Sequence, residues 1–165
     1  VHDFWSAYFY LHFYTVNTAK LSENVWKEAE KMLEQIQKYP QKEEYQKLVE
    51  ADRINLYERE AEKGDDRKFL EETDRVFKEN LKGDPAWKLY ERKLVYLESK
   101  QPDISREFER FLKKYPKVMD AYVEYSIYLC RNNKMTQAQR VYREGRKRTG
   151  MISKRAEELR RKLGL

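Results

Sequence analysis

The side chains that most often carry catalysis or bind metals are few in this 165-residue chain. His2 and His12 are its two histidines, and no cysteine or carboxylate cluster stands near them at metal-ligand spacing. His12 is therefore predicted to be a partly buried helix residue. The single cysteine, Cys130, excludes an internal disulfide, and its apolar neighbours predict a buried structural thiol. We expect no enzyme activity, no metal, no cofactor and no small-molecule substrate, because phosphate loops, nucleophile elbows and histidine dyads are also missing.

Charge is distributed unevenly along the chain. Residues 131–165 hold twelve Lys and Arg and three Glu, a net charge of +9, whereas the whole chain carries +6 and residues 1–130 therefore −3. Such clustering is typical of a surface that contacts RNA or an acidic protein in a salt-dependent way. The alternative is a solvated helix end, where cations favour the helix dipole. The candidate binding residues are Arg143, Arg146, Lys147, Arg148, Lys154, Arg155, Arg160, Arg161 and Lys162.

Aromatic residues recur in pairs in the second half of the chain. Trp87 and Tyr90 are three residues apart, as are Tyr122 and Tyr125, so each pair lies on one face of a helix. We interpret the pairs as filling the space between packed helices, with a peptide-binding or base-stacking surface as the alternative. The predicted aromatic core of the repeats is Trp5, Tyr8, Trp87, Tyr90, Phe108, Tyr122, Tyr125 and Tyr142.

Three arginines, Arg75, Arg106 and Arg140, occupy equivalent points in the pattern. The last two are 34 residues apart, and a period in this range indicates stacked helical hairpins. One interpretation is a ladder for phosphates or acidic peptides. The other is that each arginine pairs with an acidic residue of its own or the neighbouring repeat, with Glu98 and Glu124 as candidates. We expect the structural role, because residues that recur in every repeat usually serve the repeat itself.

Helices must position all of these residues. Helical spacing of apolar residues, together with only 5 Gly and 4 Pro, predicts an all-α chain with breaks such as Pro40 and Gly150. No apolar run reaches the roughly 18 residues of a membrane span. The aromatic stretch 5–14 lacks the basic flank and cleavage site of a signal peptide, so we expect a packed helix there. About nine helices are predicted, over residues 3–16, 22–39, 42–63, 68–81, 86–100, 104–114, 119–131, 136–148 and 153–162.

We interpret residues 1–165 as a single domain, a right-handed α-solenoid of stacked antiparallel helix pairs. Its predicted parts are a degenerate first repeat over 1–40, an irregular repeat over 41–84, the two most regular repeats over 85–117 and 118–149, and a terminal helix over 150–165.

These repeats resemble half-a-TPR (HAT) repeats. That family has two aromatic residues three apart on its first helix, then arginine followed by apolar and aromatic residues on its second, and often a proline. The resemblance is strongest over residues 86–148, and an ordinary TPR-like solenoid, a bundle unrelated to either, and a subunit resembling the prenyltransferase α subunits are the alternatives. The matching residues are Trp87, Tyr90, Glu98, Arg106, Phe108 and Pro116 in one repeat, Tyr122, Tyr125, Leu129, Ala138, Arg140, Val141 and Tyr142 in the next, and Arg75, Val76, Phe77 and Glu79 in an earlier one.

The resemblance implies a function as well as a fold. HAT arrays occur largely in factors for splicing, 3′-end cleavage and ribosomal RNA maturation, where they bind proteins, often dimerise and sometimes contact RNA. The expectation is a non-enzymatic protein–protein interaction scaffold in a nuclear RNA-processing complex, with partner proteins and a homodimer among its assemblies. The alternatives are a direct RNA-binding module that uses the basic C-terminal end, and a TPR-like adaptor outside RNA processing.

Overall fold

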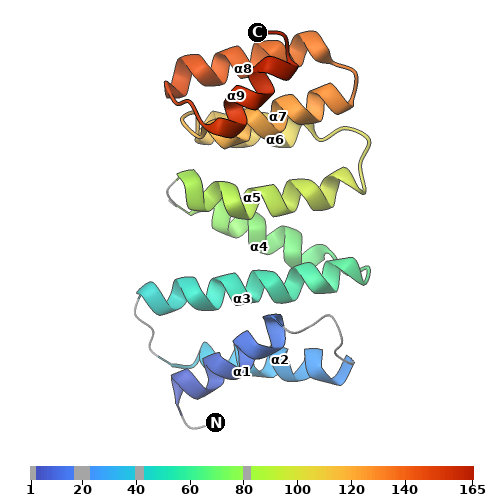
Figure 1. Ribbon diagram of the computed structural model, residues 1–165. Coiled ribbons are helices and arrows are strands. Elements are labelled where there is room, and N and C mark those ends of the chain that lie inside the picture. Colours follow the sequence, from blue (N-terminus) through green and yellow to red (C-terminus); the bar gives the residue numbers. More distant parts are fainter. Residues whose placement is uncertain (1–2, 17–22, 40–42, 80–82) are drawn as a thin grey trace. The chain divides into compact units, whose positions relative to one another are not determined.

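The computed structural model describes residues 3–16, 23–39, 43–79 and 83–165, and within these ranges it is all-helical, as predicted (Figure 1). His2, Pro40 and Leu81 lie outside the described residues. Clustering of contacts divides the chain into two compact units, Val1–Asp74 and Arg75–Leu165, called unit 1 and unit 2 below. The helices are α1 (Phe4–Val16), α2 (Glu23–Ile36), α3 (Glu43–Glu62), α4 (Arg67–Lys78), α5 (Gly83–Glu98), α6 (Ser105–Lys114), α7 (Met119–Arg131), α8 (Met135–Thr149) and α9 (Lys154–Lys162).

Unit 1 is built by packing α1 against α2 and α3. Its core consists of Ala7, Leu11, Ala29, Leu33, Ile36, Val49 and Leu56. Helix α1 is apolar nearly all round, yet only the side that carries Ala7 and Leu11 is buried. Trp5, which the sequence placed in the repeat core, is 52% exposed, and Phe9 is 69% exposed. Because α1 has no polar face that could be turned outward, aromatic rings occupy its outer surface.

Ion pairs join the first half of α4 to the rest of unit 1. Lys68 contacts Glu30 of α2 at 2.6 Å and Glu60 of α3 at 3.7 Å. Arg53 of α3 and Glu72 of α4 are 3.0 Å apart, and both side chains are largely buried. These contacts fix the rotation of α4, whose residue Phe69 is fully buried.

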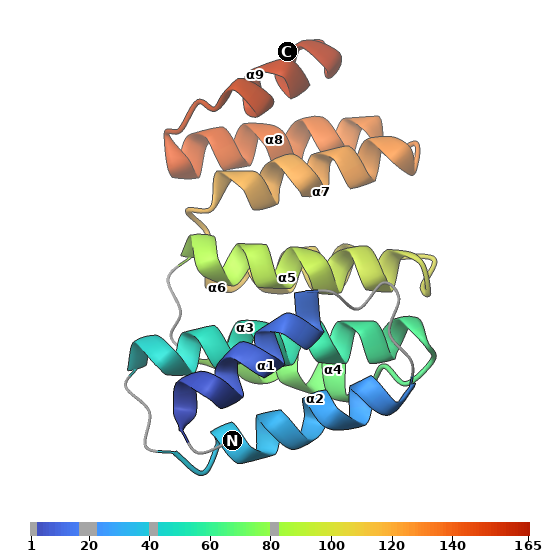
Figure 2. The same ribbon diagram turned by 60° about the horizontal axis from the view of Figure 1, so that its bottom comes forward.

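In unit 2, α7 and α8 run side by side in opposite directions (Figure 2). The turn between them uses Asn133 in the left-handed region, at φ 59°, a conformation that asparagine tolerates better than most residues. The helices approach closely at Gly145 of α8, where a Cβ atom would lie 2.6 Å from the Tyr122 side chain. Glycine at this position therefore sets the distance between α7 and α8.

Aromatic side chains dominate the core of unit 2. The rings of Phe77 and Tyr90 have centroids 4.8 Å apart, and those of Tyr90 and Phe111 are 5.2 Å apart. Further along, Phe108 stacks on Tyr125 at 4.8 Å. Such pairs contribute about 0.5–1.5 kcal/mol each beyond the apolar area that they bury. Of the predicted aromatic core residues, Trp87, Tyr90, Phe108, Tyr122, Tyr125 and Tyr142 are all buried.

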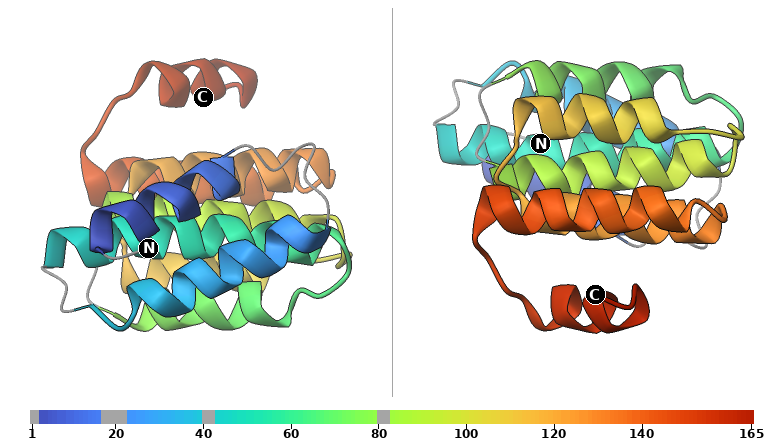
Figure 3. Two further views of the ribbon diagram at one scale, coloured as in Figure 1. Left: turned by 90° about the horizontal axis from the view of Figure 1, so that it is seen from below. Right: turned by 90° about the horizontal axis from the view of Figure 1, so that it is seen from above.

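Helix α9 packs on α7 and runs opposite to α8 (Figure 3). It begins at Ser153, whose hydroxyl oxygen accepts a hydrogen bond from the Ala156 backbone N–H at 3.1 Å. Its buried side is held by Leu159 and Leu163. In the part of the chain that the structure describes, no helix combines the length and apolar character that crossing a membrane requires.

Candidate partner-binding groove

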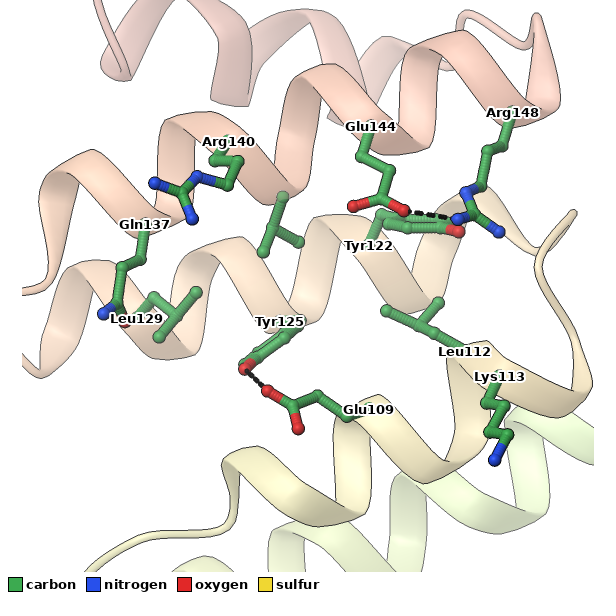
Figure 4. A pocket seen from close by; sticks show the side chains of 11 residues that line it. Glu109, Leu112, Lys113, Tyr122, Tyr125, Leu129, Gln137, Arg140, Glu144 and Arg148 are labelled. Atoms are coloured by element: carbon green, nitrogen blue, oxygen red, sulfur yellow. Dashed lines mark hydrogen bonds and ion pairs between the residues drawn. The ribbon is translucent and has the colours of Figure 1, made fainter.

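A groove of about 540 Å³ lies in unit 2 between α6, α7 and α8 (Figure 4). Its base is formed by Tyr122, Tyr125 and Leu129 of α7, which follow one another at spacings of three and four and so share one face of the helix. Leu112 of α6 and Val141 of α8 add apolar surface. The groove thus lies where the face of α7 that carries Tyr122 and Tyr125 meets α6 and α8.

The two tyrosines at the base are held in place. The Tyr122 hydroxyl donates to the Pro116 carbonyl at 3.1 Å, and the Tyr125 hydroxyl donates to Glu109 at 3.2 Å. Burial raises the pKa of Tyr125 to about 12, the nearby Glu109 charge acts in the same direction, and a hydrogen bond with Ser105 opposes it. Burial also raises the pKa of Tyr122. Both rings are therefore neutral near pH 7, and they form a buried, rigid base beneath the groove.

The charged groups around the groove are unequally engaged. Glu144 pairs with Arg148 at 2.7 Å, and Glu109 accepts the hydrogen bond from Tyr125. Arg140 and Lys113 are both exposed, and neither forms an ion pair with any residue that the structure describes. Of the two groove carboxylates, Glu144 is neutralised by Arg148 and Glu109 keeps its charge, so two cations without an ion-pair partner stand against one such carboxylate and leave the groove net positive.

The three recurring arginines pair only in part as predicted. Arg75 contacts Glu79, an acidic residue of its own predicted repeat, as expected. Arg106 and Arg140 are exposed and have no ion-pair partner within the described ranges. The two predicted acceptors instead bind arginines of later helices. Glu98 of α5 pairs with Arg131 of α7 at 2.9 Å, and Glu124 of α7 pairs with Arg155 of α9.

These two ion pairs connect helices in the same way. Each joins alternate helices, α5 to α7 and then α7 to α9, with partners 33 and 31 residues apart. Glu98 and Glu124, the acidic candidates from the sequence, are therefore structural links between alternate helices of unit 2. The arginine that binds each one depends on how the helices are rotated and offset, which one-dimensional spacing does not specify.

The nine basic residues of the C-terminal end fall into two groups. Four of them form ion pairs within unit 2: Arg146 and Arg160 with Glu157, Arg148 with Glu144, and Arg155 with Glu124. The other five are exposed and form no ion pair among the described residues: Arg143, Lys147, Lys154, Arg161 and Lys162. We call these five residues the free cations. About half of the predicted basic residues are thus engaged in ion pairs, of which Arg146–Glu157 joins α8 to α9 and Arg155–Glu124 joins α9 to α7.

A buried polar cluster in unit 1 was not anticipated from the sequence. Asp52 of α3 is 2% exposed, accepts a hydrogen bond from the Thr15 hydroxyl at 2.8 Å, and contacts Nδ1 of His12 at 3.1 Å. The His12 side chain is 51% exposed, so it is more open than predicted. The only signal was that Asp52 interrupts the apolar face marked by Val49 and Leu56, at spacings of three and four.

The remaining candidates for chemistry are isolated. Cys130 is half-buried, its Sγ lies 4.0 Å from Sδ of Met135, and burial raises the pKa of its thiol. A raised pKa disfavours the reactive thiolate at neutral pH. Across the described ranges, no three His, Cys, Asp or Glu side chains are grouped so that they could hold a metal ion.

Comparisons with protein-family models, curated proteins and solved structures give no match to this chain. The resemblance to HAT repeats therefore rests on the residues quoted from the sequence, and the function is argued from the groove and the free cations.

Proposed function

We propose that this protein is a non-enzymatic protein–protein interaction scaffold, a solenoid of stacked helix pairs that acts in a nuclear RNA-processing complex. The groove between α6, α7 and α8 is the site where a partner chain binds. The observation that carries the proposal is the combination of a fixed tyrosine base with two unengaged cations in one groove of about 540 Å³. The RNA-processing setting comes from the HAT resemblance alone.

The mechanism of such a scaffold is geometric. Tyr122 and Tyr125 are buried and held by hydrogen bonds to Pro116 and Glu109, so the base of the groove is rigid and little freedom is lost there when a partner binds. Arginine and tyrosine are the side chains most often found at the energetic centres of protein interfaces. Arg140 beside these rings is therefore the main anchor that we assign.

Comparative affinity purification tests the proposal. The tagged protein is incubated with nuclear extract, and bound proteins are quantified for the wild type, a Gln137→Ala/Arg140→Ala variant and an Arg106→Ala variant. Gln137 and Arg140 line the groove, whereas Arg106 is an exposed arginine at the equivalent point of the preceding repeat and does not line it. We expect a set of RNA-processing proteins that the wild type and Arg106→Ala retain and the groove variant loses. Equal recovery by all three proteins would contradict the assignment of the groove.

A second candidate function is direct contact with RNA, and the free cations favour it. Binding of this kind should weaken steeply with salt, with a slope of about −0.7 per phosphate contacted on a single strand. Titration of single-stranded RNA across a salt series, with Arg143→Glu/Lys147→Glu as the variant, tests it. Loss of binding in that variant would support an RNA contact, and unchanged binding would refute it.

A further inference from the structure

We infer that the groove between α6, α7 and α8 selects an acidic partner segment, one with two carboxylates separated by apolar side chains. This inference rests on the proposed function, because it names the chemistry of the chain that the scaffold would hold. Its basis is charge complementarity. Arg148 neutralises Glu144, and Glu109 only accepts a hydrogen bond from the Tyr125 hydroxyl, whereas Arg140 and Lys113 are exposed and unpaired among the described residues, so the cations outnumber the remaining carboxylate by one.

The position of the cations sets the spacing of the acidic groups. Arg140 and Arg148 both line the groove and are eight residues apart on α8, which corresponds to a rise of about 12 Å. Lys113 lies toward the Arg148 end, so the two unpaired cations stand at opposite ends of the groove (Figure 4). An extended peptide advances about 3.3 Å per residue. Because Lys113 lies on α6, across the groove from α8, the rise along α8 sets a minimum, and two acidic side chains need a spacing of at least about four residues to reach both cations.

Apolar surface lies between the two cations. Leu112 and Val141 line the groove and are half-buried, whereas Tyr122, Tyr125 and Leu129 line it but are almost fully buried. Residues between the two acidic groups of the partner would thus meet the aliphatic side chains of Leu112 and Val141. A purely polar acidic tract would leave this surface uncovered, so the segment must combine leucine-like and acidic residues.

The same groove is poorly suited to RNA. Tyr122 is 2% exposed and Tyr125 is 6% exposed, so neither ring presents a face on which a base could stack. A strand with a phosphate on every nucleotide would also place negative charge beside Glu109 and Glu144, whereas a peptide can place its acidic groups at the two cations alone. A peptide can alternate acidic and apolar groups to match this arrangement, whereas each nucleotide of RNA carries a phosphate.

Fluorescence anisotropy with the full chain tests the inference. The probe is a labelled peptide with the core Glu-Leu-Ala-Leu-Glu, and its matched control has both acids replaced by Gln. Each peptide is titrated against the wild type, an Arg140→Gln/Lys113→Gln variant and Arg106→Gln. Hydrogen bonds between charged groups are stronger than those to a neutral amide, so we expect the acidic peptide to bind about tenfold more tightly than the control. We expect the groove variant to lose this difference and Arg106→Gln to keep it.

The other outcomes overturn the inference in distinguishable ways. Equal binding of both peptides, lost in Val141→Arg, would show a groove that binds peptides without selecting acidic ones, and the scaffold proposal would stand. Binding of single-stranded RNA that depends on Arg140, with no peptide binding, would replace the peptide by RNA. If neither peptide nor RNA binds, the inference fails, and comparative purification then decides the scaffold proposal separately.

Discussion

At the scale of single residues, the most telling feature of this protein is how its buried polar groups are satisfied. Tyr90 and Lys93 of α5 both donate to Glu107 of α6, at 2.6 Å and 3.0 Å. Lys93 is itself buried and forms an ion pair with Glu107. Hydrogen bonds of this kind join neighbouring helices, and they make the fold sensitive to pH at identifiable positions.

Glu107 should contribute to stability against acid. Burial acts to raise its pKa, but the hydrogen bonds from Tyr90 and Lys93 outweigh burial and lower the pKa below its usual value. The folded state therefore favours the charged form, and this stabilisation is present above the unfolded pKa of about 4.3 and lost as the pH falls further. We expect Glu107→Gln to be less stable at pH 7 and to lose less stability than the wild type on acidification.

Denaturant unfolding at pH 7 and pH 3.5 measures this effect. Glu158→Gln, an exposed acid of α9, is the control. An identical loss of unfolding free energy on acidification in the wild type and in Glu107→Gln would contradict the role assigned to Glu107.

Tyr125 predicts the opposite behaviour at alkaline pH. Its pKa of about 12, raised chiefly by burial, lies above the value of about 10 in an unfolded chain. The folded state favours the neutral form, so this stabilisation is present below pH 10 and lost as the pH rises through 12. We expect Tyr125→Phe to lose less stability than the wild type between pH 9 and pH 11.5. Chemical denaturation at the two pH values measures this, with Tyr10→Phe at an exposed position as control. An equal loss of unfolding free energy in the wild type and in Tyr125→Phe would contradict the prediction.

The Asp52 cluster should be important for unit 1. Asp52 receives hydrogen bonds from Thr15 and contacts His12, and it is almost fully buried. Asp52→Leu would remove the hydrogen bonds to Asp52 but leave the Thr15 hydroxyl the His12 carbonyl as an acceptor at 3.1 Å, so the expected cost is that of a lost hydrogen bond, about 0.5–1.5 kcal/mol. We expect a lower melting temperature measured by circular dichroism. A variant as stable as the wild type would show that the cluster makes no net contribution.

At the scale of helices, close packing of α7 on α8 depends on one glycine. Gly145→Ala would place a Cβ atom 2.6 Å from the side chain of Tyr122, against ring and Cβ atoms that cannot move freely. Overpacking of this kind costs about 1–3 kcal/mol, although alanine is the better helix former. We expect Gly145→Ala to lower the free energy of unfolding and Arg143→Ala, on an exposed side of α8, to leave it nearly unchanged. Stabilisation by Gly145→Ala would contradict the close approach.

The helices themselves were largely predictable from sequence. Helical periodicity and breakers placed α7 at its observed bounds of residues 119–131 and α8 within one residue at each end. Such boundaries are local, because they depend on residues a turn apart. The outer surface of α1 was not predictable, since a helix that is apolar on all sides does not indicate which side is covered. The exposure of Trp5 is a consequence.

The candidate site was predictable only in part. The sequence marked Tyr122, Tyr125 and Arg140 as recurring positions, and all three line the groove. It did not indicate that the tyrosines would be fixed by Pro116 and Glu109, or which arginines would bind Glu98 and Glu124. Those contacts join residues on different helices, and the offset between helices is decided by packing. The same reason accounts for the four basic residues that turned out to be engaged in ion pairs.

At the scale of the whole molecule, the groove and the free cations together form one positively charged region of unit 2. Unit 2 combines a groove with cations at its ends, and free cations on α8 and α9 extend the positive charge beyond the groove. Arg143 and Lys147 follow Arg140 at spacings of three and four, so the three lie along one side of α8. A scaffold of this kind would attract acidic partners over some distance, and salt would slow their association.

The most direct test of the central claim is site-specific photocrosslinking in nuclear extract. A photoreactive amino acid is placed at Gln137 in the groove or at Arg106 outside it, and crosslinked peptides are identified by mass spectrometry. The account predicts that Gln137 crosslinks to acidic, leucine-containing segments of RNA-processing proteins, and that a free peptide with the core Glu-Leu-Ala-Leu-Glu competes with them. Crosslinks from Arg106 alone, or to RNA in place of protein, would contradict it.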